Sequence, residues 1–172
     1  QSALNKRIVL NQAYQNAKIK VNPLVLIQIP TGNEGEDKQE FIESFLAKND
    51  ITIENKKLAI WLSEDKVNLE VLNNNSNKVE FLIFKQAIST GWDCPRAQVL
   101  VRFREVKSIV FNIQVVGRIL RMPEAEHYKN DDLNKAYIYV NTSTFDIESE
   151  ISNPNIIKSL KSKRKDIYEP LE

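Results

Sequence analysis

Five short and almost purely apolar runs, separated by longer polar or amphipathic stretches, constrain the fold of this 172-residue chain more than any other feature. Runs of this length without strict alternation are typical of strands covered on both faces, as in parallel sheets. We therefore predict one α/β domain, a mostly parallel sheet with helices on both faces, whose ligands bind beyond the carboxyl ends of the strands. The predicted strands are Leu24–Ile29, Leu58–Leu62, Val79–Phe84, Val99–Phe103 and Ala136–Val140.

The first predicted helix occupies residues 1–20 and ends at Asn22-Pro23, because a residue before proline disfavours helical geometry. Its pattern is loosely amphipathic, and we expect Arg7 to lie among its polar positions. The side expected to face the core carries Leu4, Ile8, Val9, Ala13 and Ala17.

Further helices are predicted from their capping signals. Asp37 and Glu40 make a capping-box-like start after a loop at residues 30–35. The side chains that this helix is expected to bury are Phe41, Ile42, Phe45 and Leu46. A later helix, with Ser108 as its candidate cap, is expected to stop before Pro123, and Asn153-Pro154 begins a terminal helix. Residues 63–78 fit either a strand or a short helix, and the pattern leaves both open.

Composition narrows the classes of function. A single Cys and a single His argue against a disulfide, a Cys-based metal cluster or a zinc site, and favour a cytoplasmic location. No run of 18 apolar residues and no signal-peptide pattern occurs, so we expect neither a membrane partner nor export. The formal net charge is only +1, so any nucleic-acid surface must be a local patch. The chain begins at Gln1, and we expect it to be a piece of a larger protein.

The segment from Asn112 to Pro123 places four unusual residues on one face of a helix, at i, i+3, i+4 and i+7. They are Gln114, Gly117, Arg118 and Arg121. A glycine inside a helix costs about 1 kcal/mol relative to alanine, so it needs a packing or functional reason. Two guanidinium groups aimed in one direction suit a phosphate, which they bind bidentately. The alternative is an exposed Arg-rich helix that forms salt bridges with local acids.

A second segment, Phe84 to Arg96, follows a predicted buried strand and therefore lies at the edge where ligands bind. Gly91 permits close backbone approach, and the Asp93 carboxylate is a candidate acceptor for a ribose hydroxyl. Pro95 stiffens the exit from the loop. The alternative is an ordinary turn in which Trp92 fills the core.

These two segments together resemble motifs V and VI of superfamily 2 helicases. The resemblance rests on Gly91-Trp-Asp93 and on Gln114-x-x-Gly-Arg-x-x-Arg121, separated by one strand and one helix. The extended forms, Lys85 to Ala97 and Gln114 to Pro123, are most similar to the Res subunit of type III restriction–modification enzymes. Pro23 to Ile29 is similar to the motif IV strand, so the resemblance covers roughly residues 22–141.

The resemblance implies a three-layer RecA-like domain at residues 22–150, preceded by a connecting helix at 1–21 and followed by a basic helix or linker at 151–172. It implies that ATP with Mg²⁺ binds between this domain and an N-terminal RecA-like domain of the same parent chain. Arg121 and Arg118 would then be arginine fingers, with Arg121 preferred, and Gln114 would sense the nucleotide. Gly91, Asp93 and Gly117 would face the nucleotide.

The resemblance also implies a surface for double-stranded DNA. Lys85 stands where many family members carry a Thr that contacts a nucleic-acid phosphate, and a lysine can hold a phosphate only as a point charge. The weaker candidates for backbone contacts are Thr90, Thr31 and Gly32. A DNA methyltransferase (Mod) subunit is a further implied partner.

A phosphate-binding loop of the form Gly-x-x-x-x-Gly-Lys-[Ser/Thr] does not occur in the sequence, so the chain carries half of an ATPase site. We expect it to be inactive alone and to serve ATP-driven DNA translocation with its partner domain. The alternatives are the corresponding lobe of a type I restriction motor or an excision-repair-like helicase. A non-catalytic α/β module that binds a partner or nucleic acid is a third possibility.

Overall fold

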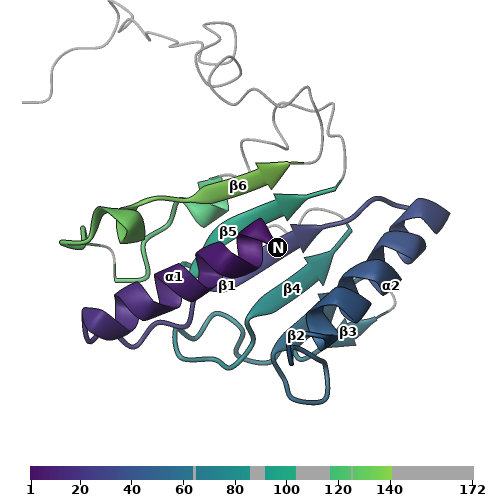
Figure 1. Cartoon of the computed structure of the whole chain (residues 1–172), viewed down its shortest axis with the longest axis horizontal. Helices are drawn as coiled ribbons and strands as arrows, with labels where there is room; N and C mark the ends of the chain where they lie inside the picture. The colour runs from purple at the N-terminus through teal and green to yellow at the C-terminus, as the bar shows by residue number, and fades with distance from the viewer. Residues whose placement is uncertain (64, 86–91, 104–116, 125, 141–172) are drawn as a thin grey trace, which may run out of the picture.

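The computed structural model describes residues 1–63, 65–85, 92–103, 117–124 and 126–140, which form a six-stranded sheet with flanking helices (Figure 1). The strands are β1 (Leu24–Gln28), β2 (Leu58–Trp61), β3 (Lys66–Val67), β4 (Phe81–Phe84), β5 (Ala97–Arg102) and β6 (Tyr137–Val140). Their order is β3-β2-β4-β1-β5-β6, and every neighbouring pair is parallel except β2 with β3. The predicted α/β class is confirmed, and the arrangement is that expected of a RecA-like domain.

Strand β1 lies at the centre of the sheet and explains the unbroken apolar run of its sequence. It pairs with β4 on one side and β5 on the other, in a register that sets Leu26 opposite both Leu82 and Leu100. All five residues of β1 are buried, as expected for a parallel strand that is covered on both faces.

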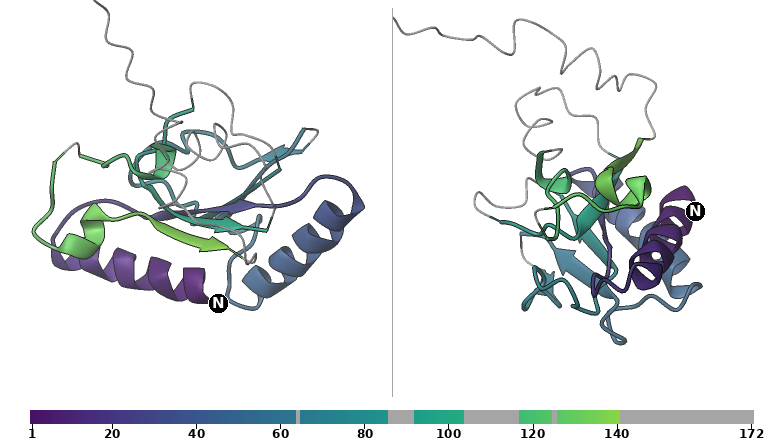
Figure 2. Two further views of the ribbon diagram at one scale, coloured as in Figure 1. Left: turned by 90° about the horizontal axis from the view of Figure 1, so that it is seen from above. Right: turned by 90° about the vertical axis from the view of Figure 1, so that its left-hand side faces the viewer.

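Two helices cover one face of the sheet, α1 (Ser2–Asn16) and α2 (Asn33–Ala47), and Figure 2 shows them on the same side. Leu10 and Tyr14 of α1 and Leu46 of α2 pack there in one cluster with Val25 and Ile27. The opposite face carries a second cluster, in which Leu72, Cys94 and Ile119 cover residues of four strands. Those strand residues are Leu24, Leu26, Ala59, Leu82, Phe84, Ala97 and Leu100.

The prediction of which side of the first helix faces the core is partly wrong, because the buried side is rotated by part of a turn. Ile8 and Val9 are 55% and 50% exposed, whereas Arg7 is buried. The Arg7 guanidinium pairs with the Glu80 carboxylate at 3.1 Å and donates to the Pro23 carbonyl, so its charge has partners inside the fold. Burial lowers the pKa of Arg7, and the Glu80 charge opposes that shift. An arginine with such partners can occupy an inner position that a pattern of apolar residues assigns to isoleucine or valine.

Helix α2 begins at Asn33, not at Asp37, and the predicted capping box does not form. Gly32 precedes the helix with a φ of 75°, a conformation that side chains disfavour. Gly35 lies so close to the preceding turn that a Cβ on it would be 2.2 Å from the Pro30 oxygen. These two glycines allow the chain to turn directly from strand into helix, which an Asp-based cap would not predict. Of the four side chains expected inside, Ile42 and Leu46 are buried and Phe45 is partly buried, as predicted, whereas Phe41 is 65% exposed.

Residues 63–78 hold the short strand β3 and a series of turns, so the strand alternative is correct only for Lys66 and Val67. A 3₁₀ helix, η1 (Asp131–Asn134), leads into β6, the predicted strand at residues 136–140, which forms an edge of the sheet. Ser108 and the predicted terminal helix from Asn153 lie outside the described residues. Among the described residues, none of the helices has the length and the apolar character that a bilayer-spanning segment requires.

Candidate functional site

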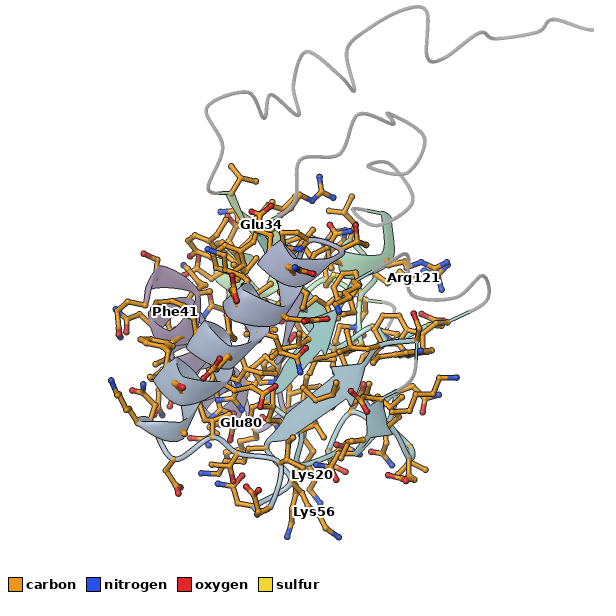
Figure 3. The ribbon with its side chains drawn as sticks, turned by 90° about the vertical axis from the view of Figure 1, so that its right-hand side faces the viewer. Lys20, Glu34, Phe41, Lys56, Glu80 and Arg121 are labelled. Carbon is orange, nitrogen blue, oxygen red and sulfur yellow. The ribbon has the colours of Figure 1, made fainter. Side chains whose placement is uncertain are left out.

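The segment before β5 and the helical turn after it contact each other directly. The Arg121 Nη1 lies 2.7 Å from the Asp93 Oδ1, and the two side chains are 50% and 51% exposed. Arg118 donates a hydrogen bond from its Nη1 to the backbone carbonyl of Trp92. The two sequence segments singled out as candidates for one site are therefore neighbours in the fold, and Arg121 projects from the surface (Figure 3).

The described part of the helix after β5 is held by a buried side chain. Residues 117–119 are helical, and the chain leaves the helix before Pro123, as predicted. Ile119 is 1% exposed and packs into the cluster under this turn, while Gly117 is exposed. Arg121 lies just beyond the last helical residue, so it is not held on the predicted helix face. Its position permits the side chain to reach back to Asp93.

The segment that carries Asp93 is fixed to the sheet by its neighbours. The Trp92 ring meets the Trp61 ring edge-on, with centroids 6.0 Å apart. Cys94 is buried, and its Sγ lies 3.5 Å from the Leu72 carbonyl oxygen. Burial raises the pKa of the Cys94 thiol to about 11, so this residue packs as a neutral thiol.

Arg96 holds the end of this segment, and sequence reasoning did not single it out. It is 0% exposed and donates to three backbone carbonyls, those of Leu72 at 2.9 Å, Asn22 at 2.8 Å and Val79 at 2.9 Å. Burial lowers the pKa of Arg96 to about 10. An arginine next to a loop proline normally predicts a surface position, so no local pattern reveals this role.

A second group of candidates lies at the carboxyl ends of β1 and β4. These strands are adjacent and parallel, with Gln28 opposite Phe84, so the residues that follow them share one edge of the sheet. A Cβ on Gly35 would lie 3.3 Å from the Lys85 Cε, which places Lys85 beside the first turn of α2. Thr31 and Gly32 are exposed at this edge.

One further cation lies at the same edge without a sequence motif to reveal it. The Lys38 ammonium is 5.3 Å from the centroid of the Phe103 ring, and Phe103 directly follows β5. A cation over an aromatic face is attracted by the ring quadrupole. Three other predicted site residues lie outside the described residues. They are Gln114 and Gly91, which were predicted to act at the nucleotide, and Thr90, which was predicted to contact the nucleic-acid backbone.

Gly117 has no packing reason among the described residues, because a Cβ built on it meets nothing within 4 Å. A glycine exposed on a helical turn costs stability relative to alanine. Gly117 lies on the same helical turn as Arg118, four residues before Arg121 in the sequence. The surface therefore combines a half-exposed guanidinium, a half-exposed carboxylate and an approachable backbone, which suits a ligand with phosphate and hydroxyl groups.

Comparison with known proteins gives a partial similarity. The Type III restriction-modification enzyme StyLTI Res subunit of Salmonella typhimurium (strain LT2) is 31% identical to this chain over 99 residues. The match covers 58% of this chain but 9% of that protein, so the chain spans less than a tenth of the relative it matches. No family model matches the chain. Over this part of its length, the chain is similar to a type III restriction Res subunit, in agreement with the resemblance carried by its motifs.

Proposed function

We propose that this chain is the C-terminal RecA-like lobe of a helicase-like restriction motor, and that Arg121 acts on ATP held by a separate P-loop domain. The pairing of Arg121 with Asp93 carries the proposal. It brings a guanidinium and a carboxylate suited to accept a ribose hydroxyl to one exposed place. A guanidinium that reaches the transferred phosphoryl group stabilises the charge that develops in the transition state.

The two arginines have different roles in this proposal. Arg121 is half-exposed and, among the described residues, is held by one surface ion pair, so it is able to reorient toward a phosphate. Arg118 is partly buried and bonded to the Trp92 carbonyl, which makes it a positioning residue for the segment that carries Asp93. Mg²⁺ and most of the triphosphate would be held by the P-loop domain, and Gly91, Gln114 and Gly117 complete the proposed nucleotide-facing surface.

We infer a DNA-backbone surface at the carboxyl ends of β1 and β4. Lys85, Thr31 and Gly32 lie together at this edge, and Lys38 adds a second cation. Thr90 belongs to the same proposal from its place in the sequence. Lysine and backbone N–H groups contact phosphates without reading the sequence of the DNA. Such contacts suit a motor that moves along double-stranded DNA, and the similarity to a Res subunit favours a restriction system with a Mod partner.

The experiment is reconstitution of the ATPase. The purified chain alone is expected to show no ATP hydrolysis above background, because it lacks a P-loop. Combined with a P-loop domain, as one polypeptide or in trans, it should support hydrolysis that double-stranded DNA stimulates. Robust hydrolysis by the chain alone would contradict the proposal. If the combination binds DNA without hydrolysing ATP, the chain is instead a non-catalytic binding module.

A further inference from the structure

The ion pair between Arg121 and Asp93 also bears on which polyphosphates this surface accepts. Arg121 is already engaged: its Nη1 is 2.7 Å from the Asp93 Oδ1. A phosphate that binds Arg121 through its Nη1 edge, as a bidentate contact with Nη1 and Nη2 does, must therefore displace the carboxylate. This cost falls on every ligand that carries phosphates, with or without a sugar.

The exchange is feasible because both partners are about half-exposed, and exposed ion pairs contribute little net stability. Phosphate oxygens accept two parallel hydrogen bonds from a guanidinium, so a triphosphate competes well for Arg121. The exchange leaves the Asp93 carboxylate without its cation. A ligand that also offers a hydroxyl donor can occupy that carboxylate, whereas an inorganic polyphosphate cannot.

We propose that Asp93 is a specificity-determining residue: by holding Arg121, it makes this surface favour nucleoside triphosphates over inorganic polyphosphates. The proposal rests on the proposed function, since it takes Arg121 as the residue that meets the triphosphate. It adds a partner exchange, in which the sugar hydroxyl replaces Arg121 on Asp93 while the phosphate replaces Asp93 on Arg121. Removing the negative charge abolishes the cost for both ligands but weakens the compensating contact for the nucleotide alone, because a neutral acceptor binds a hydroxyl less strongly than a carboxylate does.

The test uses the ATPase that contains this chain together with its P-loop domain, with sodium tripolyphosphate as a competitive inhibitor of ATP hydrolysis. In Asp93→Asn, the inhibition constant of tripolyphosphate should fall about two- to five-fold, the range expected for loss of a surface ion pair. The KM for ATP should stay the same or rise. Asp93→Glu keeps the charge and should retain the wild-type discrimination, and Asp93→Ala repeats the test if the asparagine variant does not fold.

The matched control is Asp50→Asn. Asp50 pairs with Lys57 at the same 2.7 Å distance, and its loss changes the net charge equally. This variant should leave both constants unchanged. The proposal is overturned if Asp93→Asn leaves tripolyphosphate inhibition unchanged or weaker, or if the KM for ATP falls by the same factor as the inhibition constant. The proposed function fails separately, if Arg121→Ala hydrolyses ATP as fast as the wild type.

Discussion

The Arg118 guanidinium donates a hydrogen bond to the backbone carbonyl of Trp92, and so joins the helical turn after β5 to the segment that precedes β5. Trp92 in turn packs edge-on against Trp61, at the end of β2. The chain of contacts runs from the sheet through the tryptophan pair to Arg118. Arg121 lies outside this chain of contacts, because it meets only a half-exposed carboxylate among the described residues.

This difference in contacts predicts that replacing Arg118 lowers the free energy of unfolding more than replacing Arg121 does. Arg118→Ala should lower the free energy of unfolding by about 1 kcal/mol, the usual worth of one intramolecular hydrogen bond. Arg121→Ala should change it by less than about 0.5 kcal/mol, as exposed substitutions do. Urea denaturation of the two variants and the wild type, followed by tryptophan fluorescence, measures both. Equal losses would show that the surface pair with Asp93 is as stabilising as the bond to Trp92.

The parts of the fold that follow from the sequence are those set by local chemistry. All five predicted strands are present. The apolar runs of β1, β2, β4 and β5 match strands that are almost wholly buried, whereas β6, at the edge of the sheet, is only partly buried. The rotation of α1 was not predictable, since Arg7 enters the core through partners far away in sequence, Glu80 and Pro23. The early start of α2 depends on the contact of Gly35 with the Pro30 carbonyl, and a capping pattern does not encode that contact.

In the candidate site, too, some residues could be predicted from local sequence and others depend on distant contacts. Asp93 and Arg121 could be named from the sequence because their spacing and residue types resemble known motifs, and the fold places them in contact. The residues that hold Asp93 in place could not be named in this way. Arg96 bonds to carbonyls from three separate segments, and Lys38 approaches Phe103 only after α2 docks on the sheet. Such roles depend on tertiary contacts and leave no periodic signal.

The two glycines Gly35 and Gly117 make a matched pair for alanine substitution. In Gly35→Ala, the new Cβ would meet the Pro30 oxygen at 2.2 Å, so the first turn of α2 must shift. We expect a loss of about 2 kcal/mol or more in unfolding free energy, typical of backbone-directed overpacking. In Gly117→Ala, no described atom lies within 4 Å of the new Cβ. Stability should stay constant or rise by up to about 1 kcal/mol.

Thermal or urea unfolding tests both substitutions, and an ATPase assay adds a functional test for Gly117. If the open space beside Gly117 receives the nucleotide or the P-loop domain, Gly117→Ala should lower activity without lowering stability. A destabilised Gly117→Ala chain would show that the glycine serves packing instead.

Arg96→Met tests the buried arginine. The methionine keeps much of the apolar stem but leaves the carbonyls of Leu72, Asn22 and Val79 without their donor. At about 1 kcal/mol for each lost hydrogen bond, unfolding free energy should fall by about 3 kcal/mol. Lys20→Ala, an exposed position, is the control and should change stability by less than about 0.5 kcal/mol. Wild-type stability in Arg96→Met would mean that desolvation of the guanidinium cancels these bonds.

The raised pKa of the Cys94 thiol predicts that the folded protein loses stability in mild alkali. Burial raises the pKa of its thiol from 9.0 to about 11. Because the folded chain retains a proton that the unfolded chain releases, the stabilising effect is present below pH 9 and is lost as pH rises toward 11. By pH 10 the loss is about 1.4 kcal/mol, the value of one pKa unit.

The measurement for Cys94 compares urea midpoints at pH 8 and pH 10 for the wild type and Cys94→Ala. It stops at pH 10 because Arg96, whose pKa is lowered to about 10, contributes in the opposite direction at higher pH. The pH-dependent drop should be smaller in Cys94→Ala by about 1.4 kcal/mol. Equal drops in both proteins would show that the thiol is not protected by burial.

The most direct test of the central claim is the steady-state kinetics of Arg121→Ala in the ATPase formed by this chain and its P-loop domain. An arginine that acts in the transition state contributes about 10³- to 10⁵-fold to kcat, so kcat should fall by at least three orders of magnitude. The KM for ATP should change by less than about five-fold, the effect of one exposed charge contact. A variant that raises KM while kcat stays within about ten-fold of the wild type would contradict the account, because Arg121 would then only bind the ground state.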